Sequence, residues 1–201
     1  MLQVDVQTRT YRLAPAVLSL AHAMRTGSHI LTIAAPLMRA LAESQRINVG
    51  LAAPDRDEMV YLESIRYNRR IVLRRVVSGQ RVPMELTSLG RAYLAVAPEP
   101  RRKALLTMFK RRRASQWGPI GQAIEDARAS VNERRFCAAA WQPEVVAVAT
   151  PIVTPDAIYV LNVSISTEEP LAQVVEELCI PLMGLRREIQ KGLPFGFGRI
   201  L

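Results

Sequence analysis

The sequence predicts an α+β fold in which helices pack on an antiparallel sheet, and three observations lead to this prediction. Val145–Ser166 reads as two strands, Val145–Val153 and Ile158–Ser166, joined by a turn at Thr154–Ala157. Several other segments repeat apolar residues at the spacing of an amphipathic helix. Helices and strands come in groups along the chain rather than in strict alternation, which is typical of α+β domains.

The N-terminal elements are predicted to be short strand material over residues 1–13, followed by two helices. Pro15 suits the first turn of a helix that ends at Gly27. Its apolar stripe is Val17, Leu20, Ala21 and Met24. Ser28 can cap a second helix, in which Pro36 implies a kink. The apolar face of that helix holds Ile30, Ile33, Ala34, Leu37, Met38 and Leu41.

Three strands are expected next, namely Ile47–Ala53, Met59–Tyr67 and Arg70–Val77. Pro54–Asp57 is predicted to be the turn between the first two strands, because it is rich in turn-forming residues. Ser78–Gln80 is predicted to form a further turn.

Three helices are predicted in the middle of the chain. Thr87 is a good N-cap for a helix from Ser88 to about Val96, and Pro98–Pro100 opens the next one. Ala104, Leu105, Met108 and Phe109 are its inward residues. Lys110–Trp117 reads as a basic loop before a further amphipathic helix. The stripe of that helix is Ile120, Ala123, Ile124, Ala127 and Val131.

The C-terminal part is predicted to complete the sheet and to close with a helix. Phe136–Trp141 is a strand that leads into the hairpin, and Pro170 starts the closing helix, which Pro181 should bend. The stripe of this helix is Leu171, Val174, Val175, Leu178, Leu182, Leu185 and Ile189. The tail after Gly192 is rich in glycine and is expected to be loose.

Composition limits the class of protein. The 201 residues fit one domain or one domain with an appendage, and a hydrophobic content of 49% allows a real core. The absence of a bilayer-length apolar run and of a signal pattern predicts a cytoplasmic protein with no membrane partner. Cys137 and Cys179 lack metal-binding spacing and need not pair, and His22 and His29 both lie in the N-terminal helical region. No metal, no cofactor and no catalytic residue is therefore predicted.

The net charge of +9 comes mostly from arginine and is clustered along the chain. The clusters are Arg66, Arg69, Arg70, Arg74 and Arg75; Arg101, Arg102 and Lys103; and Lys110–Arg113. They suggest an acidic partner such as nucleic acid or an anionic ligand, or simply solvated faces of helices and strands. In a regulator they could attract DNA without reading its sequence.

The segment Val82–Ala95, which reads VPMELTSLGRAYLA, carries the most functional information. The backbone N–H groups in the first turn of a helix lack intrahelical partners, so the helix start after Thr87 is a potential anion site. Gly90 in that turn would let another group approach the backbone closely.

Four segments, in this order, resemble those of IclR-family transcription regulators. Near the start, Tyr11–Pro15 is similar to the end of the family's DNA-binding wing, and Val60–Glu63 is similar to its "VVYLE" strand. The family's "P-x-x-x-T-x-x-G-[KR]-A" helix start and its "AxP(I/V)…VSxS" hairpin come next. They are matched by Pro83, Thr87, Gly90, Arg91 and Ala92, then by Thr150, Pro151 and Ile152, and by Val163, Ser164, Ile165 and Ser166.

The resemblance implies an effector-binding domain with a GAF- or PAS-like (profilin-like) sheet. It divides the chain into a remnant of the DNA-binding wing at 1–13, a linker helix at 14–27, the effector-binding domain at 28–192 and a loose tail at 193–201. The family's winged helix-turn-helix is largely missing, which is expected of a truncated chain or a misplaced start codon. The chain as given is not expected to bind an operator specifically.

The resemblance also implies where a ligand would lie, between the loop into the Thr-capped helix and the last strands of the sheet. The matching positions are Val82, Met84, Thr87, Ser88, Leu89, Cys137, Trp141, Val145, Ala147, Ser164 and Ser166. Ser164 and Ser166 face one side of a strand, and hydroxyls opposite a helix N-terminus suit a carboxylate. The alternative is that the serines face solvent and the valines belong to the core. Cys137 is expected to pack as a small apolar residue, because no histidine is placed to activate it.

One departure from the family is Glu85, which stands where relatives often have histidine. A carboxylate there would repel an anionic ligand or accept a hydrogen bond from a ligand hydroxyl. This position argues against a very small oxo acid, and Trp141 favours an aromatic or medium-sized organic acid.

The leading hypothesis is therefore a sensing and dimerising domain of a bacterial transcription regulator. An organic-acid effector would modulate DNA binding, and the chain would form a homodimer or a tetramer, meeting operator DNA only through the missing N-terminal domain. The two alternatives are a basic protein that binds nucleic acid non-specifically and a small enzyme. For the small enzyme, the sequence offers no two carboxylates spaced as an acid–base pair.

Overall fold

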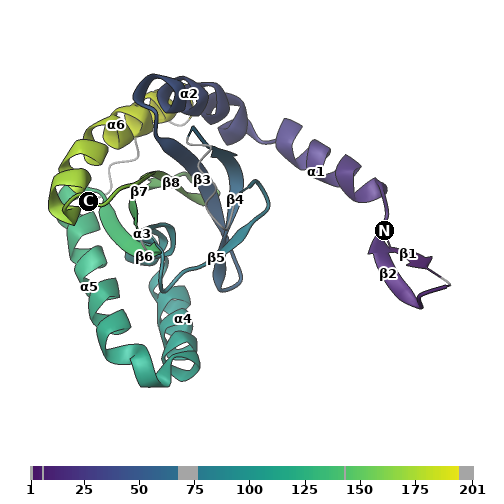
Figure 1. Ribbon diagram of the computed structural model, residues 1–201, viewed down its shortest axis with the longest axis horizontal. Coiled ribbons are helices and arrows are strands. Elements are labelled where there is room, and N and C mark those ends of the chain that lie inside the picture. The colour runs from purple at the N-terminus through teal and green to yellow at the C-terminus, as the bar shows by residue number, and fades with distance from the viewer. Residues whose placement is uncertain (1, 6, 68–76, 143, 195–201) are drawn as a thin grey trace.

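A curled antiparallel sheet forms the centre of the computed structural model, which describes residues 2–5, 7–67, 77–142 and 144–194 (Figure 1). Its six strands lie in the order β5-β4-β3-β8-β7-β6. They are β3 (Asn48–Asp55), β4 (Glu58–Ile65), β5 (Arg81–Pro83), β6 (Cys137–Gln142), β7 (Val145–Val153) and β8 (Ile158–Ser166). The predicted α+β class with helices packed on an antiparallel sheet is confirmed.

The helices are α1 (Ala16–Thr26), α2 (His29–Gln45), α3 (Ser88–Val96), α4 (Glu99–Arg112), α5 (Trp117–Arg134) and α6 (Leu171–Gly192). A short 3-10 turn, Ala114–Gln116, joins α4 to α5, and a separate hairpin of β1 (Leu2–Asp5) and β2 (Thr10–Leu13) precedes α1. Among the described helices, none combines the length and the apolar content needed to cross a bilayer.

The β7–β8 hairpin has the bounds that the sequence predicted, and its register runs from Val145 opposite Ser166 to Val153 opposite Ile158. Side chains alternate between the two faces because the period of a strand is two. Val146 and Val148 therefore belong to one core, while Ala149 belongs to the other.

Each face of the sheet carries its own core. On one face, α2 and α6 cover large residues such as Leu51, Leu161 and Val163. On the opposite face, α3 packs on β6, β7 and β8, with α4 and α5 outside it. Small residues at Cys137, Ala147 and Ala149 let α3 lie close to these strands.

Three details of the prediction are wrong. Lys110–Trp117 is not a loop, since α4 continues to Arg112 and α5 begins at Trp117 after a single 3-10 turn. Ala104 is exposed on α4, because Leu105 and Phe109 already fill the buried side of that helix. Leu171 is exposed in the first turn of α6, ahead of the buried stripe that starts at Val174. The predicted strand Arg70–Val77 lies almost wholly outside the described residues.

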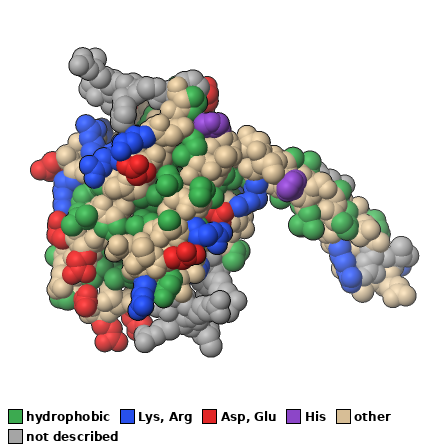
Figure 2. All heavy atoms as spheres, turned by 90° about the horizontal axis from the view of Figure 1, so that it is seen from above, with side chains coloured by type: hydrophobic (Ala, Val, Ile, Leu, Met, Phe, Trp, Pro, Cys, Tyr) green, Lys and Arg blue, Asp and Glu red, His purple; other side chains and the backbone are tan. Residues whose placement is uncertain are grey.

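The hairpin β1–β2 and α1 form an arm that projects away from the sheet (Figure 1). No residue of α1 is buried. Large apolar side chains are exposed along the arm, as Figure 2 shows, and they are Leu2, Val4, Tyr11, Leu13, Leu18, Leu20 and Met24.

Candidate functional site

The start of α3 is capped as the sequence predicted. The Thr87 hydroxyl accepts a hydrogen bond from the Gly90 N–H at 3.2 Å and donates one to the Pro83 carbonyl at 2.8 Å. Gly90 does permit a close approach, but the group that approaches is the chain's own backbone. A Cβ at Gly90 would lie 2.0 Å from the Cα and 2.2 Å from the carbonyl oxygen of Met84.

The predicted ligand residues on the loop and on α3 are closely packed. Val82, Met84 and Leu89 lie in the core on the α3 face. Ser88 is buried, and its carbonyl accepts a hydrogen bond from the Cys137 thiol at 3.5 Å. Burial raises the pKa of Cys137 to about 12, opposed by the charge of Arg91, so this thiol is a neutral packing group at neutral pH.

The remaining predicted residues lie in β6, β7 and β8. Ala147 pairs with Ser164, and both are buried. Val145 is half-buried opposite Ser166, which is exposed at the end of the hairpin. The backbone of Trp141 lies in β6, but its side chain is outside the described part of the structure.

A polar hollow opens beside Ser164 on the face that α3 partly covers. It opens to solvent, and its enclosed space has room for about one water molecule. Its lining residues are Asn48, Val49, Gly50, Tyr61, Ser64, Arg66, Asn162 and Ser164. They come from the three adjacent strands β4, β3 and β8, together with Arg66 just beyond the end of β4.

Strand register explains why these polar groups meet. Gly50 pairs with Ser64 on one side and with Asn162 on the other, while Asn48 pairs with Ser164. Residues two apart on a strand share a face, so Asn48 and Gly50 on β3, like Asn162 and Ser164 on β8, lie on the face of the sheet that carries the hollow. Gly50 lets the side chains of Asn162 and Tyr61 lie directly over the backbone of β3, because a Cβ there would lie 2.5 Å from both Asn162 Oδ1 and Tyr61 Cε1.

The electrostatics of the hollow favour an anionic ligand with polar substituents. Arg66 is half-buried, its pKa is lowered by that burial, and it has no ion pair with any described residue. Burial raises the pKa of Tyr61 to about 12, against the Arg66 charge and a side-chain hydrogen bond with Asn162, so the phenol stays neutral. The side-chain oxygens of Asn48 and Asn162 are buried without a hydrogen-bond partner in the described structure.

Sequence reasoning reached Ser164 but missed Asn48, Tyr61, Arg66 and Asn162. A signal was present, since Asn162 interrupts the apolar run Tyr159–Val163 on a strand that is otherwise buried. A polar side chain within such a strand needs a partner, so Asn162 indicates other polar groups nearby on the same face of the sheet.

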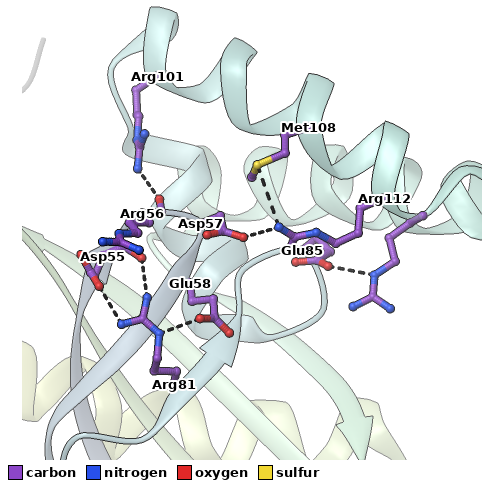
Figure 3. A network of polar contacts seen from close by, with 10 residues as sticks. Asp55, Arg56, Asp57, Glu58, Arg81, Glu85, Arg101, Met108 and Arg112 are labelled. Carbon is purple, nitrogen blue, oxygen red and sulfur yellow. Dashed lines mark hydrogen bonds and ion pairs between the residues drawn. The ribbon is translucent and has the colours of Figure 1, made fainter.

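Glu85 does not need a ligand to balance its charge. It is fully buried, and its Oε1 accepts a hydrogen bond from Arg113 Nε at 2.9 Å, while Oε2 has no partner among the described residues. Arg113 follows α4, so this ion pair connects the loop before α3 to the end of α4 (Figure 3).

Much of the described basic charge is used within the molecule. Figure 3 shows Arg112 paired with Asp57 and Arg101 donating to the carbonyl of Arg56. Arg81 bridges Asp55 and Glu58. The contacts of Arg101 and Arg112 hold α4 against the β3–β4 hairpin, and those of Arg81 hold β5 to the same hairpin, so these arginines are not freely available to nucleic acid.

The chemistry that the hollow offers is binding. Arg66 can pair with a carboxylate, the asparagine oxygens can accept hydrogen bonds, and the hydroxyls of Tyr61 and Ser164 can do either. Within the described residues, no group of three His, Cys, Asp or Glu side chains could hold a metal ion.

Comparison with solved structures shows the same fold in IclR-type regulators. A crystal structure of an IclR family transcriptional regulator from Brucella abortus has 28% sequence identity and a TM-score of 0.83, covering 96% of this chain and 74% of that one. The C-terminal domain of the E. coli regulator KdgR matches over 84% of this chain and all (100%) of its own, with 19% identity and a TM-score of 0.67.

A third match is an IclR homologue from Microbacterium hydrocarbonoxydans, crystallised in complex with 4-hydroxybenzoate. It covers 94% of this chain and 80% of its own, with 19% identity and a TM-score of 0.69.

The family model described as "Bacterial transcriptional regulator IclR C-terminal" matches residues 22–177. This range contains α2, the whole sheet, α3–α5 and the first part of α6. The chain belongs to the IclR family of bacterial transcriptional regulators, and it carries the family's C-terminal domain.

Proposed function

We propose that this chain senses an organic acid and that the bound acid modulates DNA binding by the complete regulator. The observation that carries the proposal is the polar hollow, where Arg66, which forms no ion pair with the described residues, lies among groups able to accept and donate hydrogen bonds. A half-buried cation and buried acceptors without partners among the described residues are costly unless water or a ligand satisfies them, and a ligand that does so gains affinity.

A structural neighbour supports this class of ligand. The homologue from Microbacterium hydrocarbonoxydans was crystallised with 4-hydroxybenzoate, an aromatic acid. We place the acid between the hollow and the start of α3. Ser164 supports this placement, because it is one of the ligand residues predicted from the sequence and it also lines the hollow. Thr87 and Ser88 would lie at the inner end, with Ala147 beneath them.

A clamp between α1 and β4 offers a route by which occupancy would reach the DNA-binding part. Arg25, in the last turn of α1, donates to the Leu62 carbonyl at 2.7 Å and to the Glu63 carboxylate at 2.5 Å. Tyr61, two residues before Glu63 on the same strand, lines the hollow. A ligand that shifts β4 would therefore shift the balance of α1 orientations, which is a population shift.

Arg25→Gln is expected to loosen α1 without unfolding the domain. Hydrogen bonds to charged groups contribute about 1.5–3 kcal/mol, but Arg25 is 40% exposed, so about 1 kcal/mol is a fair expectation. Amide exchange in α1 should then accelerate about fivefold, while exchange in β3 and β8 stays unchanged. The exposed Arg39 on α2 gives a matched control, Arg39→Gln, and equal effects of the two changes would contradict the clamp.

The same clamp should open in acid. Burial works to raise the pKa of Glu63, but hydrogen bonds from Arg25, Ser64 and Ser78 outweigh it and hold the pKa below its usual value. A lowered pKa in the folded state means that the contribution of the clamp is fully present above the unfolded pKa of a glutamate, about 4.3, and is lost as the pH falls through the lower folded pKa. The exchange rate of α1 should therefore be constant between about pH 5 and 8 after correction for intrinsic exchange.

Self-association is proposed through the arm. Its exposed apolar side chains include Leu18 at 74% and Leu13 at 72% exposure, which is unusual for side chains of this size. A homodimer would cover them, and a tetramer is the alternative. We further propose that the protein is cytoplasmic. We assign residues 1–13 to the DNA-binding wing, 14–27 to the linker helix, 28–192 to the effector-binding domain and 193–201 to a tail. Operator DNA would be bound by the rest of the domain to which the wing belongs.

The test of sensing is a thermal-shift screen of this chain against aromatic and aliphatic carboxylic acids, with 4-hydroxybenzoate and benzoate among them. A rise in melting temperature that depends on concentration and is confined to one class of acid supports the proposal, because binding to the folded state stabilises it. Melting temperatures that stay flat over the whole panel would contradict it.

A further inference from the structure

We propose that the outer face of α6 binds a second copy of the chain, whose own α6 packs on it in the antiparallel direction. This face is separate from the arm and from the hollow, so the inference does not depend on the ligand that the domain senses.

The first observation is the spacing of the residues that α6 turns away from the sheet. The buried residues of α6, from Val174 to Ile189, face the core, and the opposite side lies at the outside of the molecule (Figure 1). Successive residues on that outer side are alternately four and three positions apart, which is the spacing of a seam along which two helices pack. The residues of this α6 seam are Gln173, Glu177, Ile180, Gly184, Arg187 and Lys191.

The second observation is a glycine that packing within the chain does not require. Gly184 lies inside α6, where glycine is less favourable than alanine, yet a Cβ at this position would meet nothing within 4 Å. One turn before it, the side chain of Ile180 is 74% exposed. The α6 seam therefore has a flat position next to a bulky apolar one.

These two positions match each other in a two-fold pair of helices. With the axis near Leu182, antiparallel packing sets Ile180 of each copy opposite Gly184 of the other. Each isoleucine side chain would occupy the space that the opposite glycine leaves. Both exposed isoleucines would be covered, and the glycine would gain a packing role.

The charges along the α6 seam favour the same arrangement. Glu177 of each copy would lie opposite Arg187 of the other, and both side chains are exposed. Neither forms an ion pair with a described residue, since the described ion pairs of α6 use Glu176, Glu188 and Lys191. A parallel pair would instead set glutamate against glutamate and arginine against arginine, and like charges that face each other disfavour association.

A second copy is therefore the partner that fits, because the α6 seam carries both halves of each contact. The seam is short and only partly apolar, so the contact is expected to be weak by itself. Together with the association proposed for the arm, it would join two dimers into a tetramer, because two different two-fold surfaces on one chain can connect four copies.

The experiment measures the mass of the full chain by sedimentation equilibrium, with Leu18→Glu introduced to weaken association through the arm. We expect this chain to form dimers as its concentration approaches about 1 mM. Gly184→Gln fills the flat position, and Ile180→Gln removes the isoleucine. Each should raise the dissociation constant about tenfold or more and leave the circular dichroism unchanged, because neither position is packed within the chain. The matched control is Gly118→Gln, at an exposed glycine of α5 where a Cβ also meets nothing within 4 Å.

Charge reversal in the same Leu18→Glu chain tests the direction of the two helices. Glu177→Arg alone and Arg187→Glu alone each set like charges opposite each other at two symmetric places, and each should weaken the dimer about fivefold or more. The two changes together restore opposite charges and should return the dissociation constant to within about twofold. The control exchanges the charges of Glu125 and Arg128, an exposed pair on α5.

A monomer at every concentration in the Leu18→Glu chain would overturn the proposal, and so would equal dissociation constants for Gly184→Gln, Ile180→Gln and Gly118→Gln. A double charge exchange that binds no more tightly than either single reversal would overturn the antiparallel register. Equal association of the unaltered chain and the Leu18→Glu chain would contradict the arm as a contact, and it would support α6 as the surface that joins the copies.

Discussion

Gly90→Ala is expected to lower the free energy of unfolding by about 3 kcal/mol or more. The added methyl group would lie 2.0 to 2.5 Å from three backbone atoms of Met84, a distance at which atoms cannot coexist. The loop and the helix would have to separate, and this would disturb the core around Val82 and Leu89. Urea unfolding followed by circular dichroism measures the loss.

Gly184→Ala is the matched control, because Gly184 also lies within a helix, α6, but a Cβ there meets nothing within 4 Å. Alanine in a helix interior is about 0.5–1 kcal/mol more favourable than glycine, so this variant should be slightly more stable. Similar stability changes in the two variants would show that the contact between Gly90 and Met84 is not what requires glycine.

Arg113→Ala is expected to destabilise the fold by about 3–5 kcal/mol, the usual range when one partner of a buried ion pair is removed. Glu85 is fully buried, and Arg113 is the described residue that hydrogen-bonds its carboxylate. Without Arg113, neither oxygen of Glu85 would have a hydrogen-bond partner in the part of the chain that the structure describes. The double variant Glu85→Met, Arg113→Ala should recover most of the loss, because no charge is then left buried.

The control for this prediction is Arg128→Ala, which breaks an exposed pair with Glu125 at 3.4 Å. An exposed pair of this kind contributes little, about 0.5 kcal/mol. Differential scanning calorimetry of Arg113→Ala, the double variant and Arg128→Ala compares the loss of the buried pair with the loss of the exposed one. A change for Arg113→Ala as small as that for Arg128→Ala would mean that the carboxylate of Glu85 is solvated or paired in another way.

Local patterns predicted most of the secondary structure. Some features depend only on residues close together along the chain, and local sequence patterns therefore predict them. These features are the alternation in β7 and β8, the Thr87 cap and the apolar stripes of α2, α5 and α6. The end of α4 was missed because Lys110–Arg113 resembles a solvated loop in composition. In the fold, Arg112 and Arg113 are held by Asp57 and Glu85, which are distant in sequence.

The candidate site was harder to predict, because it depends on register between strands. The family motifs pointed to the start of α3 and to the β7–β8 hairpin, and α3 does pack against these two strands. The polar set of the hollow comes from β3, β4 and β8, and the pairing of Gly50 with Asn162 brings it together. No local pattern in either strand reveals that pairing.

We propose above all that an organic acid binds on the α3 face of the sheet. The most direct measurement is a crystal structure of the chain grown with the acid that gives the largest thermal shift. We expect electron density for the acid at the hollow, with its carboxylate on Arg66 and another part against Ser164. Density at the surface arginines of α4 with an empty hollow would contradict it.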